Sequence, residues 1–147
     1  MRFLSALLLC ALLALPAAAD SLRVRHIVAS PEGEVSPGAE DLGALLERNL
    51  GLAGCELVEV RTAPLSGRGG SVRASFALSA GYSLSVQGDR AKGFALTVKK
   101  DGKELLRTTF RIGAENHPVL VGGFRAGDGP DDAKKKRLFA FDVVPDG

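Results

Sequence analysis

The stretch Val72–Val86 reads V-R-A-S-F-A-L-S-A-G-Y-S-L-S-V, and its alternation of apolar and polar residues decides the fold. The even positions hold the apolar or small residues, Val72, Ala74, Phe76, Leu78, Ala80, Tyr82, Leu84 and Val86. A period of two is typical of a β-strand with one buried face. The alternation passes Ala80-Gly81 without changing phase, so a two-residue hairpin there would bring opposite faces together. We therefore expect either one long strand bent at Gly81 or two strands joined by a loop of odd length.

A second parity argument applies to the turn at Asp101-Gly102. The apolar face before this turn holds Phe94, Leu96 and Val98, and the face after it holds Leu106, Thr108, Phe110 and Ile112. A two-residue turn would place Leu96 opposite Arg107. A three-residue loop over 100–102 pairs Leu96 with Leu106 and keeps the apolar faces together. We therefore expect a three-residue, bulged hairpin.

Four other segments favour strands. Residues 22–29 predict a half-buried strand, with His26 on its apolar face and Arg23 and Arg25 on the other. Residues 55–62 form a β-branched run. Residues 118–124 predict a strand buried on both faces, with a bulge or a close backbone approach at its two glycines. The last strand covers residues 137–144, and its alternation places Asp142 on the outer face.

One helix is expected near residues 37–50. Ser36 is a candidate N-cap, followed by Pro37 at the first helical position. Four leucines recur at helical spacing and form one apolar stripe, namely Leu42, Leu45, Leu46 and Leu50. Gly51 supplies a stop, after which Leu52 is expected to fold back onto the last turn.

These elements predict a mainly β fold that is α+β at the margin. The expected architecture is an antiparallel β-sandwich or partly closed barrel of about seven to eight strands, with the N-terminal helix across one end. Glycine, with 18 residues in the chain, punctuates short apolar runs as it does between strands and turns. We expect a single domain over residues 20–147.

The first 19 residues have the pattern of a cleavable secretory signal peptide. Met1-Arg2 supplies a positive start, the segment 3–15 is apolar apart from Ser5, and Ala17-Ala18-Ala19 resembles a signal-peptidase site. An apolar run of this length is shorter than the roughly 20 residues that span a bilayer. We expect export to the periplasm or beyond, and no transmembrane segment in the mature chain.

Charge and cysteine content narrow the functional classes. Cleavage would leave 128 of 147 residues, and the loss of Arg2 would leave 18 of 19 basic residues against 17 acidic ones. Because basic and acidic residues are almost equal in number, the charge of the mature chain argues against a nucleic-acid partner. Cleavage would also remove Cys10 and leave Cys55 alone, either as a buried apolar side chain or as a free thiol that pairs with another molecule.

The sequence offers no recognisable catalytic constellation. We expect His26 to be a hydrogen-bonded core histidine and His117 to be solvated. The motifs G-x-S-x-G, H-E-x-x-H and the phosphate-binding loop with its lysine are absent from the sequence. The segment 67–71, G-R-G-G-S, is interpreted as a flexible turn. We therefore expect a protein that is not an enzyme and needs no cofactor.

Two charged clusters precede the last strand. Asp128, Asp131 and Asp132 are candidate calcium ligands, although their spacing differs from an EF-hand loop and a solvated acidic turn is the alternative. Lys134, Lys135, Lys136 and Arg137 form a basic run that is a candidate contact for an anionic lipid surface, a polysaccharide or an acidic partner. The alternative is that these side chains protect a sheet edge from association.

Three C-terminal segments resemble small exported bacterial proteins of no assigned function. They are Leu105–Ile112, Pro118–Gly123 and Leu138–Val144. The V-L-V-G-G element within the second also resembles a strand of the outer-membrane secretin domain, although the chain lacks the remaining strands of that domain. The resemblance implies an envelope setting and no site residues.

Our leading functional expectation is a non-enzymatic binding or assembly module of the cell envelope. Its partner surface would be an exposed sheet edge or the basic run at 134–137. A small-ligand or glycan-binding domain is the first alternative. The second is a hydrolase whose site is assembled across strands, which would require a histidine beside a carboxylate and a hydroxyl in a pocket.

Overall fold

The computed structural model describes residues 20–145 of the 147-residue chain, so the expected signal peptide lies outside the described residues. Eight strands, one α-helix and two short 3-10 helices follow one another in this part of the chain. They are β1 (Asp20–Ser30), α2 (Glu40–Leu50), β2 (Gly54–Pro64), β3 (Ser71–Ala77), η1 (Ser79–Gly81), β4 (Tyr82–Asp89), β5 (Gly93–Lys100), β6 (Lys103–Phe110), β7 (Val119–Arg125), η2 (Pro130–Asp132) and β8 (Lys136–Pro145).

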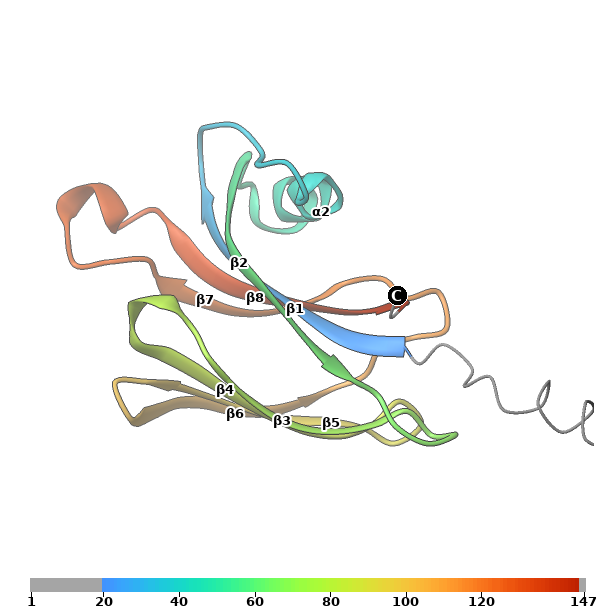
Figure 1. The fold of residues 1–147 in the computed structure, drawn as a ribbon. Coiled ribbons are helices and arrows are strands. Elements are labelled where there is room, and N and C mark those ends of the chain that lie inside the picture. The colour runs from blue at the N-terminus through green and yellow to red at the C-terminus, as the bar shows by residue number, and fades with distance from the viewer. Residues whose placement is uncertain (1–19, 146–147) are drawn as a thin grey trace, which may run out of the picture.

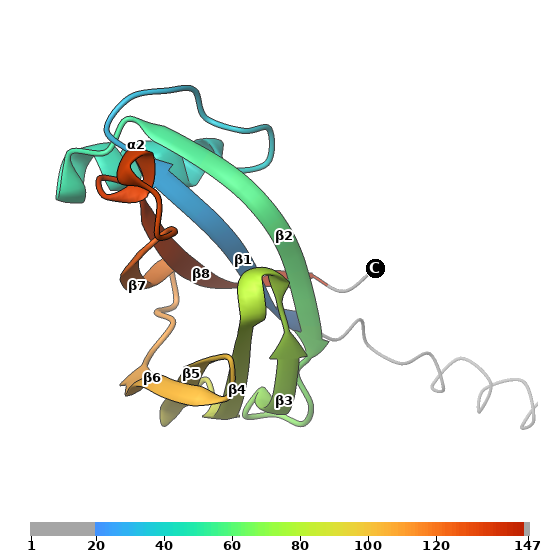
Figure 2. The ribbon, with the colours of Figure 1, turned by 90° about the vertical axis from the view of Figure 1, so that its left-hand side faces the viewer.

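Two antiparallel four-stranded sheets lie face to face, and the helix covers the far side of one of them (Figure 1). The first sheet has the order β2-β1-β8-β7 and the second the order β3-β4-β5-β6. The long strand β2 runs the length of the first sheet before the chain enters β3 of the second (Figure 2). The expected mainly β sandwich is therefore confirmed, and residues 20–145 form no closed barrel.

Apolar side chains gather in two layers. The layer between the sheets is aromatic at its centre and includes Phe94, Phe139 and Phe141, each 0% exposed. The second layer lies between the first sheet and α2, where Leu42 and Leu46 pack with Ile27 and Leu138. The first sheet is thus the middle layer of three, and its central strands are buried on both faces.

The alternation in Val72–Val86 corresponds to two strands. Phe76 pairs with Leu84 and Ala77 with Ser83, so even positions face even positions. The Leu78 amide donates to Tyr82 O at 2.8 Å, so the connection is a three-residue loop over Ser79–Gly81, which forms η1. The loop of odd length is the alternative that the structure confirms, and it keeps the apolar residues of both strands on the core face.

The expected three-residue loop at Asp101-Gly102 was wrong. Lys100 pairs with Lys103 across a two-residue turn, and the register shifts between Val98 and Lys99, where one extra residue of β6 forms a bulge. Val98 then lies opposite Leu106, and Leu96 opposite Thr108. The apolar faces of the two strands do meet, as the alternation requires. The extra residue that aligns them is a bulge within β6 and not a third residue of the turn.

The helix begins at Glu40, three residues later than expected. Ser36 is not its cap: the Ser36 hydroxyl accepts a hydrogen bond from the Leu57 amide of β2, at 3.1 Å. Gly38 has a φ of +89°, so the chain turns before the helix can start. The end is as expected, since the Gly51 amide donates to Glu47 O and the Leu52 amide to Leu46 O.

Three expectations about exposure were also wrong, and α2 explains two of them. Arg25 is 2% exposed and Asp142 is 5% exposed, because the helix covers the sheet face that we expected to be solvated. The strand at 118–124 was expected to be buried on both faces, yet Val121 is the only fully buried residue of Val119–Arg125. Among the described strands β7 pairs only with β8 and is an edge strand. Its bulge lies between Gly122 and Phe124, as expected.

Buried charges fasten the helix to the sheet. The Arg25 guanidinium donates to both carboxylate oxygens of Asp41 at 2.8 Å and to Asp142 Oδ2 at 3.2 Å. Arg23 also donates to both oxygens of Asp142, at 2.8 and 2.6 Å. The hydrogen bonds from Arg25 hold the pKa of Asp41 below its usual range, and the hydrogen bond to Asp142 raises the pKa of Arg23. Arg23 therefore remains charged in the folded protein.

Candidate functional site

A groove of about 520 Å³ opens where the end of α2, the edge strand β7 and the start of β8 meet. Its lining is mostly apolar, with Leu50, Leu52, Leu120 and Leu138 contributing side chains, Gly122 and Gly123 contributing backbone, and Asn49 and Lys136 contributing the polar groups. Leu50 is 51% exposed, which makes it the most exposed large apolar side chain of the described residues. The groove is therefore an apolar surface that the fold leaves uncovered.

The two glycines of β7 keep this groove open. Gly122 has a φ of +123°, and a Cβ atom there would lie 2.9 Å from the carbonyl oxygen of Arg137. A side chain is excluded at this position both by the backbone conformation and by the close approach of β8. A Cβ on Gly123 would meet no atom within 4 Å, so this residue faces open space. The bulge consequently leaves Leu120 only partly covered, while Leu138 forms the buried floor of the groove.

The edge of β7 has a further property that matters for binding. Among the described strands β7 pairs only with β8, so one row of its backbone N–H and C=O groups has no partner strand. Such a row is a template for another extended chain. An apolar groove beside an open sheet edge is the arrangement in which added strands bind, with backbone hydrogen bonds along the edge and side chains in the pockets.

Basic side chains lie at one end of the groove. Arg125, the last residue of β7, is the register partner of Lys136, which itself lines the groove. Lys134 is exposed and Lys135 is partly exposed, and both line a smaller hollow next to Glu32 and Asp131. Three of the four residues in the expected basic run are thus available to a partner.

Arg137 is the exception, since it is only 8% exposed and points into the molecule. Its Nη2 donates to the carbonyl of Ala126 at 2.9 Å, and its Nη1 donates to Nε2 of His26 at 2.6 Å. The guanidinium also lies over the ring of Tyr82, 5.2 Å from the ring centre. Arg137 is therefore a buried structural residue and not a partner contact.

His26 is the hydrogen-bonded core histidine that the sequence predicted. Because Arg137 can only donate, Nε2 of His26 is the acceptor, and Nδ1 carries the proton that it donates to Glu59 Oε2 at 2.8 Å. Burial lowers the pKa of His26; the Glu59 hydrogen bond opposes this effect and the Arg137 charge adds to it. His26 is therefore neutral at pH 7.

Glu59 extends this chain of contacts to the second sheet. Its Oε2 accepts a hydrogen bond from the Ser79 amide at 2.7 Å, in the loop between β3 and β4. Desolvation opposes ionisation of Glu59, but the hydrogen bonds from Ser79 and His26 outweigh it and hold its pKa below the usual range. The chain of hydrogen bonds from Arg137 through His26 and Glu59 to Ser79 consequently joins both sheets. His26 is 0% exposed and uses both ring nitrogens, so it offers no group to a substrate.

The remaining candidate residues are not brought together. His117 lies on the surface and contacts Glu115 at 2.8 Å, with its side chain 79% exposed, as a solvated histidine should be. Asp128, Asp131 and Asp132 lie in or near η2, but they form no group of three metal-ligand side chains in the part of the chain that the structure describes. Cys55 is 1% exposed, as the first alternative expected, and burial raises its pKa to about 11.

Sequence reasoning did not find the groove. Leu50 was assigned to the apolar stripe of the helix together with Leu42 and Leu46, yet it is 51% exposed whereas those two leucines are buried. The available signal was Gly122-Gly123: two residues without side chains in an apolar strand leave neighbouring leucines uncovered.

Comparisons with known proteins add no relative. No family model, no curated protein and no solved structure gives a significant match. None of the helices within residues 20–145 has the length and apolar character needed to cross a membrane.

Proposed function

We propose that the chain is an exported, non-enzymatic docking module of the cell envelope, which holds an extended segment of a partner protein along β7. The observation that carries this proposal is the apolar groove between α2 and β7 beside an open strand edge. A partner segment would add to the first sheet as a fifth strand. Its alternate side chains would then enter the groove and cover Leu50 and Leu120.

The charges around the groove define the partner segment further. Lys136 and Arg125 lie together at one end, with Lys135 and Lys134 just before them in the chain. An acidic residue at the matching end of the partner segment would pair with them, and charge complementarity of this kind selects partner and register. The expected ligand is therefore an extended segment with alternating apolar residues and an acidic end.

A peptide fits the groove better than a glycan does. Glycan sites use exposed aromatic faces, but no aromatic side chain lines the groove. The unpaired edge of β7 supplies backbone groups that only another polypeptide matches along its length. A small apolar anion could also fill the groove, but it would not use the edge of β7. The experiment must therefore distinguish binding of a peptide from binding of such an anion.

Export is the second part of the proposal, and it rests on residues 1–19. Their charged start, apolar run and Ala17-Ala18-Ala19 site support secretion to the periplasm or beyond. An envelope partner then follows from the compartment, since that is where the groove would meet other proteins.

The docking proposal is tested by fluorescence polarisation with a labelled peptide as long as β7, in which Val and Ser alternate and two Asp residues end one terminus. A second peptide carries the Asp pair at the other terminus, because the direction of the added strand is open. One of the two should bind saturably, and replacing its Asp pair by Lys should weaken binding about tenfold. Excess octanoate should not displace it.

The matched variants are Leu50→Glu and Leu105→Glu, since these leucines are similarly exposed, 51% and 44%, and only Leu50 lines the groove. Leu50→Glu should weaken peptide binding by about tenfold or more, the loss expected when a buried leucine contact is replaced by a charge. Leu105→Glu should bind like the original protein. Equal binding by the two variants, or the absence of saturable binding by either peptide, would refute the docking proposal.

A further inference from the structure

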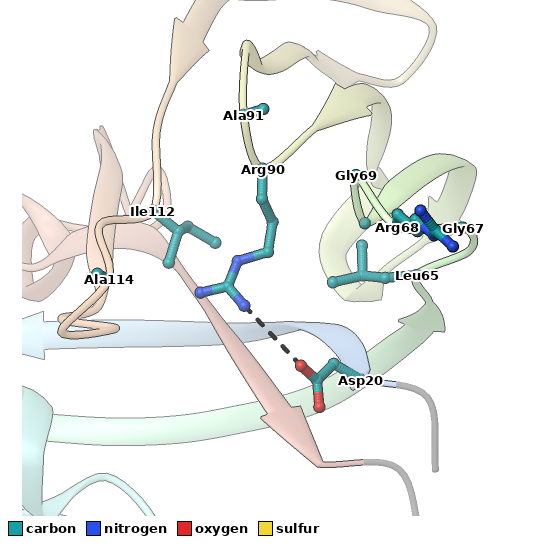
Figure 3. A pocket seen from close by; sticks show the side chains of 10 residues that line it. Asp20, Leu65, Gly67, Arg68, Gly69, Arg90, Ala91, Ile112 and Ala114 are labelled. Atoms are coloured by element: carbon teal, nitrogen blue, oxygen red, sulfur yellow. Dashed lines mark ion pairs between the residues drawn. The ribbon is translucent and has the colours of Figure 1, made fainter. Parts of the chain in front are cut away.

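A second pocket, of about 420 Å³, lies at the end of the sandwich where β1 begins. Figure 3 shows it between the turn after β4, which carries Arg90, the loop 65–71, and the start of β1 at Asp20. Its floor is apolar, because Leu65 and Ile112 line it and are only 6% and 5% exposed. Two arginines, Arg68 and Arg90, line the same pocket. Apolar floor and guanidinium groups together are typical of sites for organic anions.

The loop that carries Arg68 is closed at its base by two backbone hydrogen bonds. The amide of Ser66 donates to Ser71 O and the amide of Ser71 donates to Ser66 O, each at 2.8 Å. These two hydrogen bonds close the loop into a tight turn. Arg68 projects from this turn, and its side chain makes no hydrogen bond or ion pair within residues 20–145.

Arg90 is positioned by the same loop. Its backbone amide donates to Gly69 O at 3.1 Å. Gly70 allows the aliphatic part of the side chain to cross the loop, since a Cβ on Gly70 would lie 3.2 Å from Arg90 Cγ. The guanidinium then reaches toward Asp20, but its Nη1 remains 3.8 Å from Asp20 Oδ2, too far for a hydrogen bond (Figure 3). Arg90 lines the pocket, and its side chain makes no hydrogen bond within the described residues, so its N–H donors are available to a ligand.

We propose that this pocket binds a small organic anion, with a phosphate or carboxylate head held by Arg90 and Arg68 and an apolar group resting on Leu65 and Ile112. A guanidinium presents its donors in a plane that matches either head group. Gly67 and Gly69 leave room for the head, because a Cβ on either would meet no atom within 4 Å. The Asp20 carboxylate is the internal competitor for Arg90, and its loose contact is released when the anion binds.

This site is independent of the docking groove, because the two share no lining residue. Calorimetric titration of the protein purified from an exporting host tests it with four probes: phenyl phosphate, phenylacetate, inorganic phosphate and benzyl alcohol. At least one phenyl anion should bind saturably, and at least about tenfold more tightly than inorganic phosphate, since the ring buries apolar surface. Benzyl alcohol should not bind. Binding of phenyl phosphate alone, or of phenylacetate alone, identifies the head group.

Three variants and one control decide which residues act. Arg90→Gln should weaken binding about tenfold, the effect of removing a charged hydrogen bond, and Arg68→Gln should also weaken it. Asp20→Asn should strengthen binding, because it removes the competing carboxylate. Arg107→Gln is the control, since Arg107 is 75% exposed on β6 and pairs with Glu104. Unchanged affinity in Arg90→Gln with its thermal unfolding intact, or no saturable binding of either phenyl anion, would overturn the proposal.

Discussion

Nη1 of Arg137 donates a hydrogen bond of 2.6 Å to Nε2 of His26, in the interior between the two sheets. This contact forces the proton of His26 onto Nδ1, which faces Glu59. It also holds Arg137, the last residue of the basic run, inside the molecule and away from any partner. One hydrogen bond thus separates the residues of the run that a partner can reach from the one that stabilises the fold.

The first prediction follows from this buried histidine. Its pKa lies below the ordinary 6.5 in the folded state, chiefly because burial disfavours the charged ring. As the pH falls through 6.5 the unfolded chain binds a proton before the folded chain does, so the free energy of unfolding falls. The stabilising effect is fully present above 6.5 and is lost as the pH descends toward the folded pKa. Denaturant unfolding at about pH 7.5 and about pH 5.5 measures this difference.

Two variants assign the effect to one residue. His26→Gln has no titratable ring, so its stability should change less between the two pH values, although it is lower at both. His117→Gln removes an exposed histidine and should retain the full pH dependence. Glu59 and Asp41 also have lowered pKa values, but they lose their contributions only below their ordinary 4.5 and 3.8, outside the tested window. An unchanged pH dependence in His26→Gln would contradict the assignment.

The second prediction concerns Asp142, the carboxylate shared by Arg23 and Arg25. Asp142→Asn leaves Arg25, 2% exposed, with one carboxylate partner fewer beneath the helix. Removing one member of a buried ion network exposes the desolvation cost of the other, so the free energy of unfolding should fall by about 2 to 4 kcal/mol. Urea-induced unfolding, followed by circular dichroism, measures the loss.

Glu104→Gln is the matched control for Asp142→Asn. It also removes a carboxylate that binds an arginine, but the Glu104–Arg107 pair is exposed, with side chains 43% and 75% accessible. An exposed pair contributes at most about 1 kcal/mol, because water screens it. Equal losses in the two variants would show that the network under α2 stabilises the fold no more than a surface pair does.

The sequence predicted the β-rich class and most strands because alternation with a period of two is a local signal. The odd-length loop after β3 and the end of the helix at Gly51 follow from the same kind of local rule. The hairpin at Asp101-Gly102 shows the limit of such a rule: parity required one extra residue, and nothing local distinguished a longer turn from a bulge in β6.

The alternation pattern carries no information on which distant elements cover a sheet face or on which strand lies at the edge of a sheet. Arg25 and Asp142 look solvent-facing by alternation, and only the docking of α2 onto that face buries them. Conversely, the apolar run at 118–124 resembles a central strand, yet the order of the sheet makes β7 an edge. The groove depends on both facts, since it lies between α2 and β7, and it was therefore not predictable from either segment alone.

The third prediction concerns the thiol of Cys55. It is 1% exposed, and burial raises its pKa to about 11, so the reactive thiolate is scarce at neutral pH. In a Cys10→Ser background, native protein should not react with Ellman's reagent, whereas protein unfolded in guanidinium should react with one equivalent. Rapid reaction of the native protein, or a disulfide-linked dimer on a non-reducing gel, would contradict burial of this cysteine in solution.

The fourth prediction concerns residues 1–19 and the compartment. When residues 1–30 are fused to alkaline phosphatase, which folds only where disulfides form, a bacterial host should show phosphatase activity, and mass spectrometry of the full chain should find Asp20 as its first residue. Leu9→Arg should abolish this activity because it charges the apolar run, whereas Ser30→Arg, outside the run, should leave it unchanged. A chain that keeps Met1 in the cytoplasm would contradict export. It would also take the groove away from any envelope partner, although the peptide-binding experiment would still test the groove itself.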